Sequence, residues 1–361
     1  MGSICRVILL VLTFMLGAGP SYGLPQLLLD MRTGEVLFEK DAGHPWHPAS
    51  LTKLMTAYSA FEAIAAGRVT LDTPVVMSEN ALKAPPSKMG FPVGTAVTLE
   101  DALYLMIVKS ANDVATAIGE TVAGSEAEFV DLMNWHAANL GLTATRFANA
   151  HGLHDPSQIT SARDIAILAF VIRSRYPQYD EMFETRAIKF GRSTLKSYNI
   201  LLEKFRGTTG MKTGYVCASG LNIVATAKRN GRELMAVVFG GVTSRERGEL
   251  AALLLERGFQ GRYPGTRQSV TNIVNRALAP PNMRPQMCGA EAKTYLETRK
   301  AAFPFGLEGQ ISYLNDVVPE RAVRVTTLGT IVDVDLPRPR PAYSYVPEPI
   351  ALPRPRPATL P

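Results

Sequence analysis

The sequence lacks any clustering of positive charge. Its 361 residues include 38 Lys and Arg against 32 Asp and Glu, so the formal net charge of +6 is modest for this size. The basic residues do not form a stripe with interleaved aromatic side chains, which is the pattern typical of a nucleic-acid-binding surface. With 46% hydrophobic and 19% charged residues, the composition predicts a globular protein without a nucleic-acid partner.

Long apolar runs are equally scarce, and the one candidate lies at the start of the chain. Arg6 precedes an apolar run from Val7 to Leu16, which is shorter than the roughly 20 residues that a membrane-spanning helix needs. Small residues and a proline follow, which is typical of a secretory signal cleaved after Gly23. We predict a signal peptide over residues 1–23 and export to the periplasm or cell envelope, with an uncleaved anchor as the alternative.

Only three cysteines occur, and Cys5 falls inside the predicted signal peptide. Cys217 and Cys288 remain in the exported chain, where the redox conditions permit disulfides. The sequence does not show whether their Cβ atoms lie close enough to be bridged. A disulfide and two buried, unbonded thiols therefore both stay open.

The pattern of apolar and turn residues predicts one layered domain over residues 24–262. Two strands come first, a series of helices follows from about residue 50, and three strands rich in β-branched residues begin after residue 209. The last two of these strands are joined by Asn230-Gly231, a strong hairpin signal, and a helix closes the region. Strands, many helices, an antiparallel set and a final helix predict an α+β architecture.

Beyond residue 262 the sequence has little sustained apolar periodicity. Residues 263–336 are an uncertain C-terminal extension in which we expect at most one β-hairpin, over residues 321–336. Residues 337–361 hold nine of the 25 prolines, and LPRPRPA appears twice, so we predict a disordered polyproline-type tail. Its arginines would contact an anionic envelope surface, or the tail would serve as a solvated spacer.

Ser50 and Lys53 are three residues apart at the start of a predicted helix, so they share a face. A serine hydroxyl becomes a good nucleophile when a neighbouring base takes its proton. Lysine can be that base if burial or a second cation lowers its pKa. Taken alone, the pair is explained as well by a helix cap and an outward lysine, and STLK at 193–196 has the same spacing.

Two further short motifs make the pair more specific. Ser110-x-Asn112 lies at a predicted joint between two helices, and Lys212-Thr213-Gly214 occurs once, on a predicted strand. Three weak signals in this order, each in a suitable structural context, together make one strong signal.

The three motifs resemble those of the serine penicillin-binding proteins and β-lactamases. The chain is most similar to the exported, low-molecular-mass D-alanyl-D-alanine carboxypeptidases of peptidase family S11. The similarity extends through LLLDMRTGEVLFEKDAGHPWHPASLTKLMTAY, LEDALYLMIVKSANDVATAIGE and GMKTGYVCASGLNIVATAKRNG, and covers roughly residues 26–260. It implies a β-lactamase/DD-peptidase-like fold, an antiparallel sheet flanked by helices with a helical subdomain.

The same resemblance implies an activity and assigns roles. The enzyme would remove the terminal D-alanine from peptidoglycan stem pentapeptides through an acyl-enzyme on Ser50, and β-lactam antibiotics would acylate it. Lys53 would be the base, Ser110 would relay a proton to the departing D-alanine, and Asn112 would orient Lys53 and the substrate.

Binding roles follow from the resemblance as well. Lys212, Thr213 and Gly214 would engage the terminal carboxylate together with Arg247, and Lys212 would help to keep Lys53 neutral. Backbone N–H groups of Ser50 and Tyr215 would form the oxyanion hole. No metal or cofactor is expected.

A zinc hydrolase is the alternative that the histidines suggest. His44 and His47 are three apart, as are His151 and His154. Neither pair forms the H-E-x-x-H signature and both lie in loops with glycine or proline, so we expect loop histidines.

Two departures from the family pattern leave alternatives open. Tyr215 stands where several members have histidine, and the usual amphipathic anchoring helix at the C-terminus is missing, so membrane attachment is undecided. The Glu-x-x-Leu-Asn segment by which class A β-lactamases activate water does not occur between Asn112 and Lys212. A DD-endopeptidase, a β-lactamase and a non-catalytic peptidoglycan-binding protein remain as rival functions.

Overall fold

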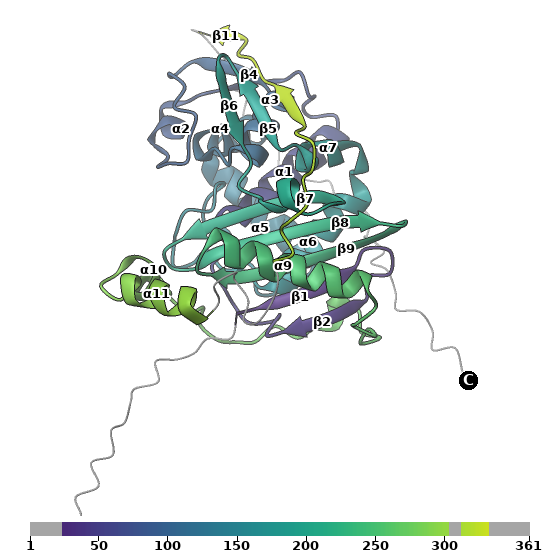
Figure 1. Ribbon diagram of the computed structural model, residues 1–361. Helices are drawn as coiled ribbons and strands as arrows, with labels where there is room; N and C mark the ends of the chain where they lie inside the picture. Colours follow the sequence, from purple (N-terminus) through teal and green to yellow (C-terminus); the bar gives the residue numbers. More distant parts are fainter. Residues whose placement is uncertain (1–23, 303–311, 332–361) are drawn as a thin grey trace, which may run out of the picture.

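The computed structural model describes residues 24–302 and 312–331. Its centre is a five-stranded antiparallel sheet in the order β2-β1-β9-β8-β7 (Figure 1). The strands are β1 (Gln26–Asp30), β2 (Val36–Lys40), β7 (Thr208–Val216), β8 (Gly220–Arg229) and β9 (Arg232–Gly241). The predicted turn at Asn230-Gly231 is confirmed: both residues have positive φ, and Arg229 pairs with Arg232 across it.

Both faces of the sheet are covered, which explains the continuous apolar runs in the middle of β1 and β9. One face packs on α9 (Ser244–Phe259) through Leu28, Ile223 and Val238. The other face packs on α1 (Lys53–Ala65) and α6 (Ala162–Arg175) through Leu27 and Leu29. Successive residues of β1 therefore face opposite cores, as the alternation of side chains along a strand requires. The predicted α+β architecture is confirmed.

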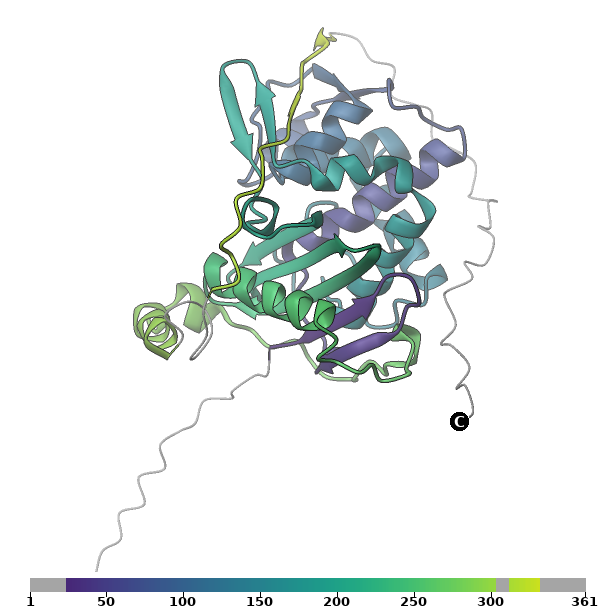
Figure 2. The ribbon, with the colours of Figure 1, turned by 45° about the vertical axis from the view of Figure 1, so that its right-hand side comes forward.

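A helical subdomain lies over one edge of this sheet (Figure 2). Its helices are α2 (Glu79–Lys83), α3 (Leu99–Val108), α4 (Asn112–Ala123), α5 (Glu126–Asn139) and α7 (Asp180–Glu184). Two of these helices have a side-chain N-cap, because Thr98 accepts from the N–H of Asp101 and Ser125 from that of Glu128. The short strands β3 (Pro74–Val76), β4 (Thr95–Thr98), β5 (Ala187–Phe190) and β6 (Ser193–Lys196) complete it, and α8 (Leu201–Lys204) leads into β7.

The C-terminal extension contains two short strands that do not pair with each other within residues 321–331, and the rest of the segment considered for a hairpin lies outside the described residues. The strand β10 (Ala322–Arg324) pairs in parallel with β5, and β11 (Gly329–Thr330) pairs with β4. Each covers an edge of a small two-stranded sheet, where free backbone groups are available, so the two segments do not pair with each other. The boundaries at 262 and 336 stay predictions.

A disulfide links the extension to the domain. Cys217, just past the end of β7, is bonded to Cys288 with a Cα–Cα distance of 5.7 Å. Cys288 ends α10 (Arg284–Cys288), which is followed by α11 (Ala292–Ala302). The alternative of two unbonded thiols is thereby excluded, and Figure 1 shows both helices projecting beside the end of the sheet.

Two predicted segments, the signal peptide at 1–23 and the proline-rich tail at 337–361, lie outside the described residues. Within the described part of the chain, no helix combines the length and the apolar character that crossing a bilayer requires.

Candidate active site

Ser50 lies on a tight turn rather than at the cap of an α-helix. It belongs to the 3-10 helix η1 (Ala49–Thr52), and α1 begins only at Lys53. Ala49 has a φ of 50°, a conformation that costs energy for a residue with a Cβ atom. The side chains of Ser50 and Lys53 still lie on the same side, as predicted, because the Lys53 Nζ is 3.1 Å from the Ser50 Oγ.

Two glycines from distant segments press against this turn. A Cβ atom on Gly214 would lie 2.9 Å from the Ser50 nitrogen, and one on Gly152 would collide with the carbonyl oxygen of Ala49. The glycine of the Lys212-Thr213-Gly214 motif is therefore required for close packing of β7 against the backbone of Ser50.

Lys53 is surrounded by acceptors. Its side chain is 1% exposed, and Nζ donates to the Oδ1 of Asn112 at 2.6 Å and to the carbonyl oxygen of His151 at 2.5 Å. The Asn112 amide is oriented by its other end, since Nδ2 donates to the carbonyl oxygen of Pro85 at 2.8 Å. A neutral amine has two protons, so these two acceptors take both of them, and the lone pair is left for the hydroxyl of Ser50.

The electrostatics favour this neutral amine. Burial, and after it the charge of Lys212, lowers the pKa of Lys53 well below its ordinary value, although Asp113 acts in the opposite direction. Asp113 is itself occupied, because its carboxylate accepts from the backbone N–H groups of Met89, Gly90 and Val114. The acid thus fixes the loop between α2 and β4 instead of pairing with the lysine.

Ser110 connects the second motif with the third. Its φ of 62° at the joint between α3 and α4 is unusual for a residue other than glycine. The Nζ of Lys212 donates to the Ser110 Oγ at 2.9 Å. Burial, followed by the charge of Arg247, lowers the pKa of Lys212 to about 7.

Arg247 completes a group of buried cations. It is 3% exposed, and burial lowers its pKa to about 10. One guanidinium nitrogen donates to the carbonyl oxygen of Tyr198 at 2.9 Å, whereas the buried Nε has no hydrogen-bond partner among the described residues. A buried cation with an unpaired donor, near the partly charged Lys212, is suited to an anionic ligand.

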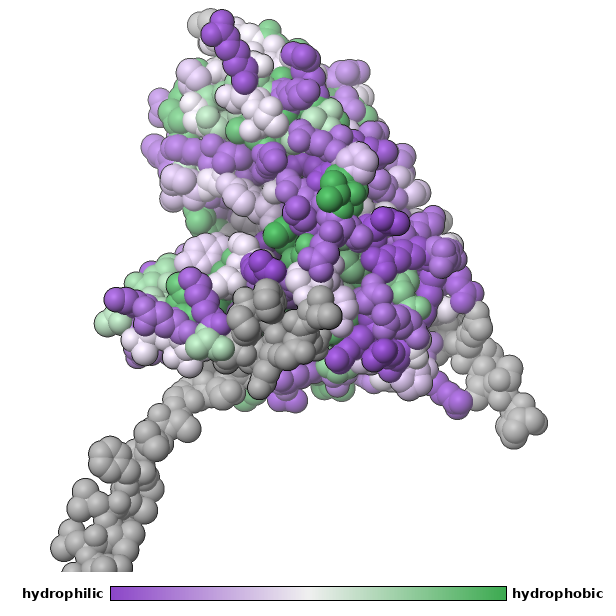
Figure 3. All heavy atoms as spheres, in the orientation of Figure 1, coloured by the Kyte–Doolittle hydropathy of each residue, from purple (hydrophilic) through white to green (hydrophobic). Residues whose placement is uncertain are grey.

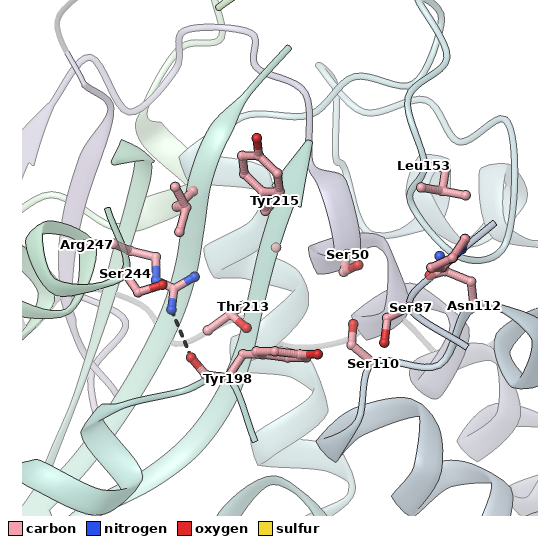
Figure 4. Close-up of a pocket in the computed structure, with 13 residues that line it drawn as sticks. Ser50, Ser87, Ser110, Asn112, Leu153, Tyr198, Thr213, Tyr215, Ser244 and Arg247 are labelled. Carbon is pink, nitrogen blue, oxygen red and sulfur yellow. Dashed lines mark hydrogen bonds between the residues drawn. The ribbon is translucent and has the colours of Figure 1, made fainter. Parts of the chain in front are cut away.

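These residues surround one cavity of about 370 Å³. Its lining contains the expected residues Ser50, Ser110, Asn112, Thr213, Gly214, Tyr215 and Arg247, together with the unexpected Pro86, Ser87, Leu153, Tyr198, Leu221 and Ser244. Figure 4 shows Tyr215 and Tyr198 at opposite ends of this cavity, with Ser50 and Ser110 on the helical side and Arg247 across β7. The molecular surface is hollowed between the helical part and the part that bears α10 and α11 (Figure 3).

Lys53 and Lys212 do not line the cavity, but their Nζ atoms contact the lining residues Ser50 and Ser110. The structure therefore brings all nine predicted site residues into one neighbourhood. It also reveals Asn222, a buried residue whose Nδ2 donates to the carbonyl oxygens of His47 and Pro48 at 3.0 and 3.2 Å. No short motif marks Asn222, because its partners are more than 170 positions away.

The four histidines of the two pairs lie in loops. The rings of His47 and His154 are in edge contact at 4.8 Å, and His151 lies behind Lys53 with its pKa lowered to about 3 by burial and by Lys53. Among residues 24–302 and 312–331, no group of three or more His, Cys, Asp or Glu side chains is arranged to hold a metal ion.

Comparisons with known proteins agree with this geometry. Residues 25–243 match the peptidase S11 family, described as D-alanyl-D-alanine carboxypeptidase. The D-alanyl-D-alanine carboxypeptidase DacD of Escherichia coli (strain K12) is 34% identical over 241 residues, which are 65% of this chain and 62% of the relative. The chain thus spans less than two thirds of the length of that relative.

Solved structures are also similar. Penicillin binding protein 6B from Escherichia coli aligns with a TM-score of 0.63 and 34% identity, covering 65% of this chain and 77% of the other. Penicillin-binding protein D2 from Listeria monocytogenes, in its cefotaxime-bound form, aligns with a TM-score of 0.59 and 27% identity over 65% of this chain and 96% of the other.

Proposed function

Because the chain belongs to the D-alanyl-D-alanine carboxypeptidase family, peptidase S11, we propose that it is a serine carboxypeptidase that removes the terminal D-alanine from peptidoglycan stem peptides. Its fold is that of the penicillin-binding DD-peptidases. The observation that carries the proposal is the position of the buried Lys53 Nζ, which is bonded to the oxygens of Asn112 and His151 and lies 3.1 Å from the Ser50 Oγ, so that a neutral amine there directs its lone pair at the hydroxyl.

Acylation follows from this arrangement. Lys53 takes the proton of Ser50, and Oγ attacks the carbonyl of the penultimate D-alanine. Backbone N–H groups of Ser50 and Tyr215 stabilise the developing oxyanion, and such a donor typically contributes about 3 kcal/mol to transition-state stabilisation. Ser110, which receives a hydrogen bond from Lys212, relays the proton that Lys53 took from Ser50 to the departing amine, so that Lys53 is neutral again when the D-alanine leaves. Lys53 then deprotonates the water that releases the acyl group.

The carboxylate of the substrate binds at the other end of the cavity. Thr213 and Arg247 line it there, and Lys212 adds positive charge from behind. The unpaired Nε of Arg247 supports this role. Tyr198 and Arg247 border this end of the cavity through their mutual hydrogen bond, which favours a free D-alanine terminus over the cross-linked chain that a DD-endopeptidase cleaves.

Penicillins are proposed as slowly released acylating inhibitors. None of the cavity-lining residues within the described part of the chain is a carboxylate, so the lining offers no acid to activate water as a class A β-lactamase does. The polar residues needed for acylation are present together, which also argues against a non-catalytic peptidoglycan-binding role.

Labelling with a fluorescent penicillin tests the proposal. The wild-type protein should become covalently tagged, and Ser50→Ala should not. Ser193→Ala is the matched control, because Ser193 begins the exposed STLK segment on β6, which has the same spacing, and it should label like the wild type. Labelling of Ser50→Ala at the wild-type rate would remove Ser50 from the nucleophile role.

Digestion of purified muropeptides distinguishes the activities. Mass analysis should detect pentapeptides shortened by one alanine, while cross-linked dimers stay intact. Cleavage of dimers alone would instead support the DD-endopeptidase.

We propose that the protein is exported to the periplasm or cell envelope, on the basis of the predicted signal peptide. Peripheral contact of the Pro/Arg tail with an anionic envelope surface is proposed from its sequence alone.

A further inference from the structure

The C-terminal extension is anchored beside the cavity, at the end of β7. The N–H of Met283 donates to the carbonyl oxygen of Ala218 at 2.9 Å, and the Cys217–Cys288 disulfide follows. Arg299 on α11 pairs with Glu246 on α9. Cys288 lies beyond residues 25–243, so this anchorage is not part of the segment that matches the family.

Tyr215 is the cavity residue that this anchorage holds. Its hydroxyl donates to the Sγ of Cys288 at 3.1 Å and lies 3.8 Å from the Sγ of Cys217. Tyr215 and Cys217 are two residues apart at the end of a strand, so their side chains lie on the same side. The tyrosine is nevertheless 48% exposed and lines the cavity, so its hydroxyl end is fixed while much of its ring stays available.

The position of this ring relative to the chemistry indicates what it contacts. β7 is the last strand of the sheet, so a peptide can lie along its outer edge. A substrate peptide with its terminal carboxylate at Thr213 and Arg247 and its scissile carbonyl at Ser50 would extend toward Tyr215 (Figure 4). One extended residue advances the chain by about 3.3 Å, so the amino acid before the two D-alanines comes next to the ring.

We propose that Tyr215, fixed by the Cys217–Cys288 disulfide, is a specificity-determining residue that packs on a long side chain of the amino acid preceding D-Ala-D-Ala. The methylene stem of a diamino acid would cover the ring face, and its terminal ammonium would extend toward solvent. The inference rests on the proposed carboxypeptidase function. The disulfide acts through Tyr215 and is a positioning element.

Two acyl peptides that differ in one residue test this inference. One ends in L-Lys-D-Ala-D-Ala and the other in L-Ala-D-Ala-D-Ala, and the measured quantity is the ratio of their kcat/KM values. In the wild type the lysyl peptide should be preferred. Tyr215→Ala should lower this ratio about tenfold, which corresponds to the loss of one well-packed aromatic contact.

A second variant isolates the anchorage. Cys217→Ala/Cys288→Ala keeps the ring but releases its hydroxyl, so the ratio should fall about threefold, as expected for the loss of a weak hydrogen bond. If that variant does not fold, Tyr215→Phe removes the same hydrogen bond and should lower the ratio similarly. An unchanged ratio in Tyr215→Ala overturns the specificity role, and an unchanged ratio in the anchorage variant overturns the positioning role.

Failure of the proposed function looks different from failure of this inference. A wild-type protein that releases no D-alanine from either peptide contradicts the carboxypeptidase itself. A wild-type protein that cleaves both peptides, with a ratio that no variant changes, contradicts the inference alone.

Discussion

Replacing Asn112 by aspartate tests directly whether Lys53 must be neutral. The change keeps the shape of the side chain but places a negative oxygen where Oδ1 now lies, 2.6 Å from the Lys53 Nζ. With an effective dielectric constant of about 20, two unit charges at that distance attract by about 6 kcal/mol. Because the attraction favours the ammonium form, the pKa of Lys53 should rise.

Even half of that energy has a large kinetic effect. About 3 kcal/mol corresponds to roughly two pKa units, so the neutral fraction of Lys53 at neutral pH should fall by up to about 100-fold, with the full factor where the ammonium form dominates in both proteins. The acylation rate should fall in proportion, because only the neutral amine takes the proton of Ser50. The lost rate should return as the pH is raised.

The assay is the second-order rate constant of acylation by a fluorescent penicillin, measured from about pH 6 to about pH 10. Asn112→Ala is the control that removes the same hydrogen bond without adding a charge. Its rate should fall, but its pH profile should shift much less than that of Asn112→Asp. An Asn112→Asp enzyme that is acylated at neutral pH as fast as the wild type would refute the neutral-lysine reasoning.

Three further predictions follow from packing, burial and covalent linkage. Gly214→Ala should strongly slow acylation by a fluorescent penicillin, because its Cβ would lie 2.9 Å from the Ser50 nitrogen. Labelling at the wild-type rate would show that β7 can shift without displacing Ser50. Burial lowers the pKa of His136 to about 3, so unfolding, which frees it to bind a proton, should become easier as the pH falls from about 6.5 towards 3, by up to about 5 kcal/mol. Urea unfolding across this range should show a smaller pH dependence for His136→Gln, and an equal dependence would assign the effect elsewhere. Removing the disulfide with Cys217→Ala/Cys288→Ala should cost about 4 kcal/mol, since it closes a loop with a sequence separation of 71, and an unchanged thermal midpoint would contradict this.

Apolar spacing and turn residues are the local signals in this sequence, and the structure agrees with both. Apolar spacing and turn residues depend on neighbours within a few positions, so the β8–β9 hairpin and the N-caps Thr98 and Ser125 could be predicted. The spacing of Ser50 and Lys53 could be read as well. The 3-10 conformation at Ser50 could not be predicted, because the two glycines that pack against this turn, Gly152 and Gly214, come from distant parts of the chain.

The C-terminal extension shows the limit of local patterns. Residues 322–324 and 329–330 have strand character, but their partners β5 and β4 lie more than 130 positions earlier. A hairpin is the default expectation when only neighbouring residues are considered. Instead, β10 and β11 pair with the free edges of β5 and β4 in the helical subdomain.

By itself, the sequence determined the α+β class, the order of the elements and the three motifs, because these depend on side-chain type and short spacing. Tertiary structure alone decided that Lys53, Lys212 and Arg247 share one buried region, and that Cys217 meets Cys288 beside Tyr215. Burial and charge proximity set the pKa of an amine, and both arise only when segments distant in the chain pack together.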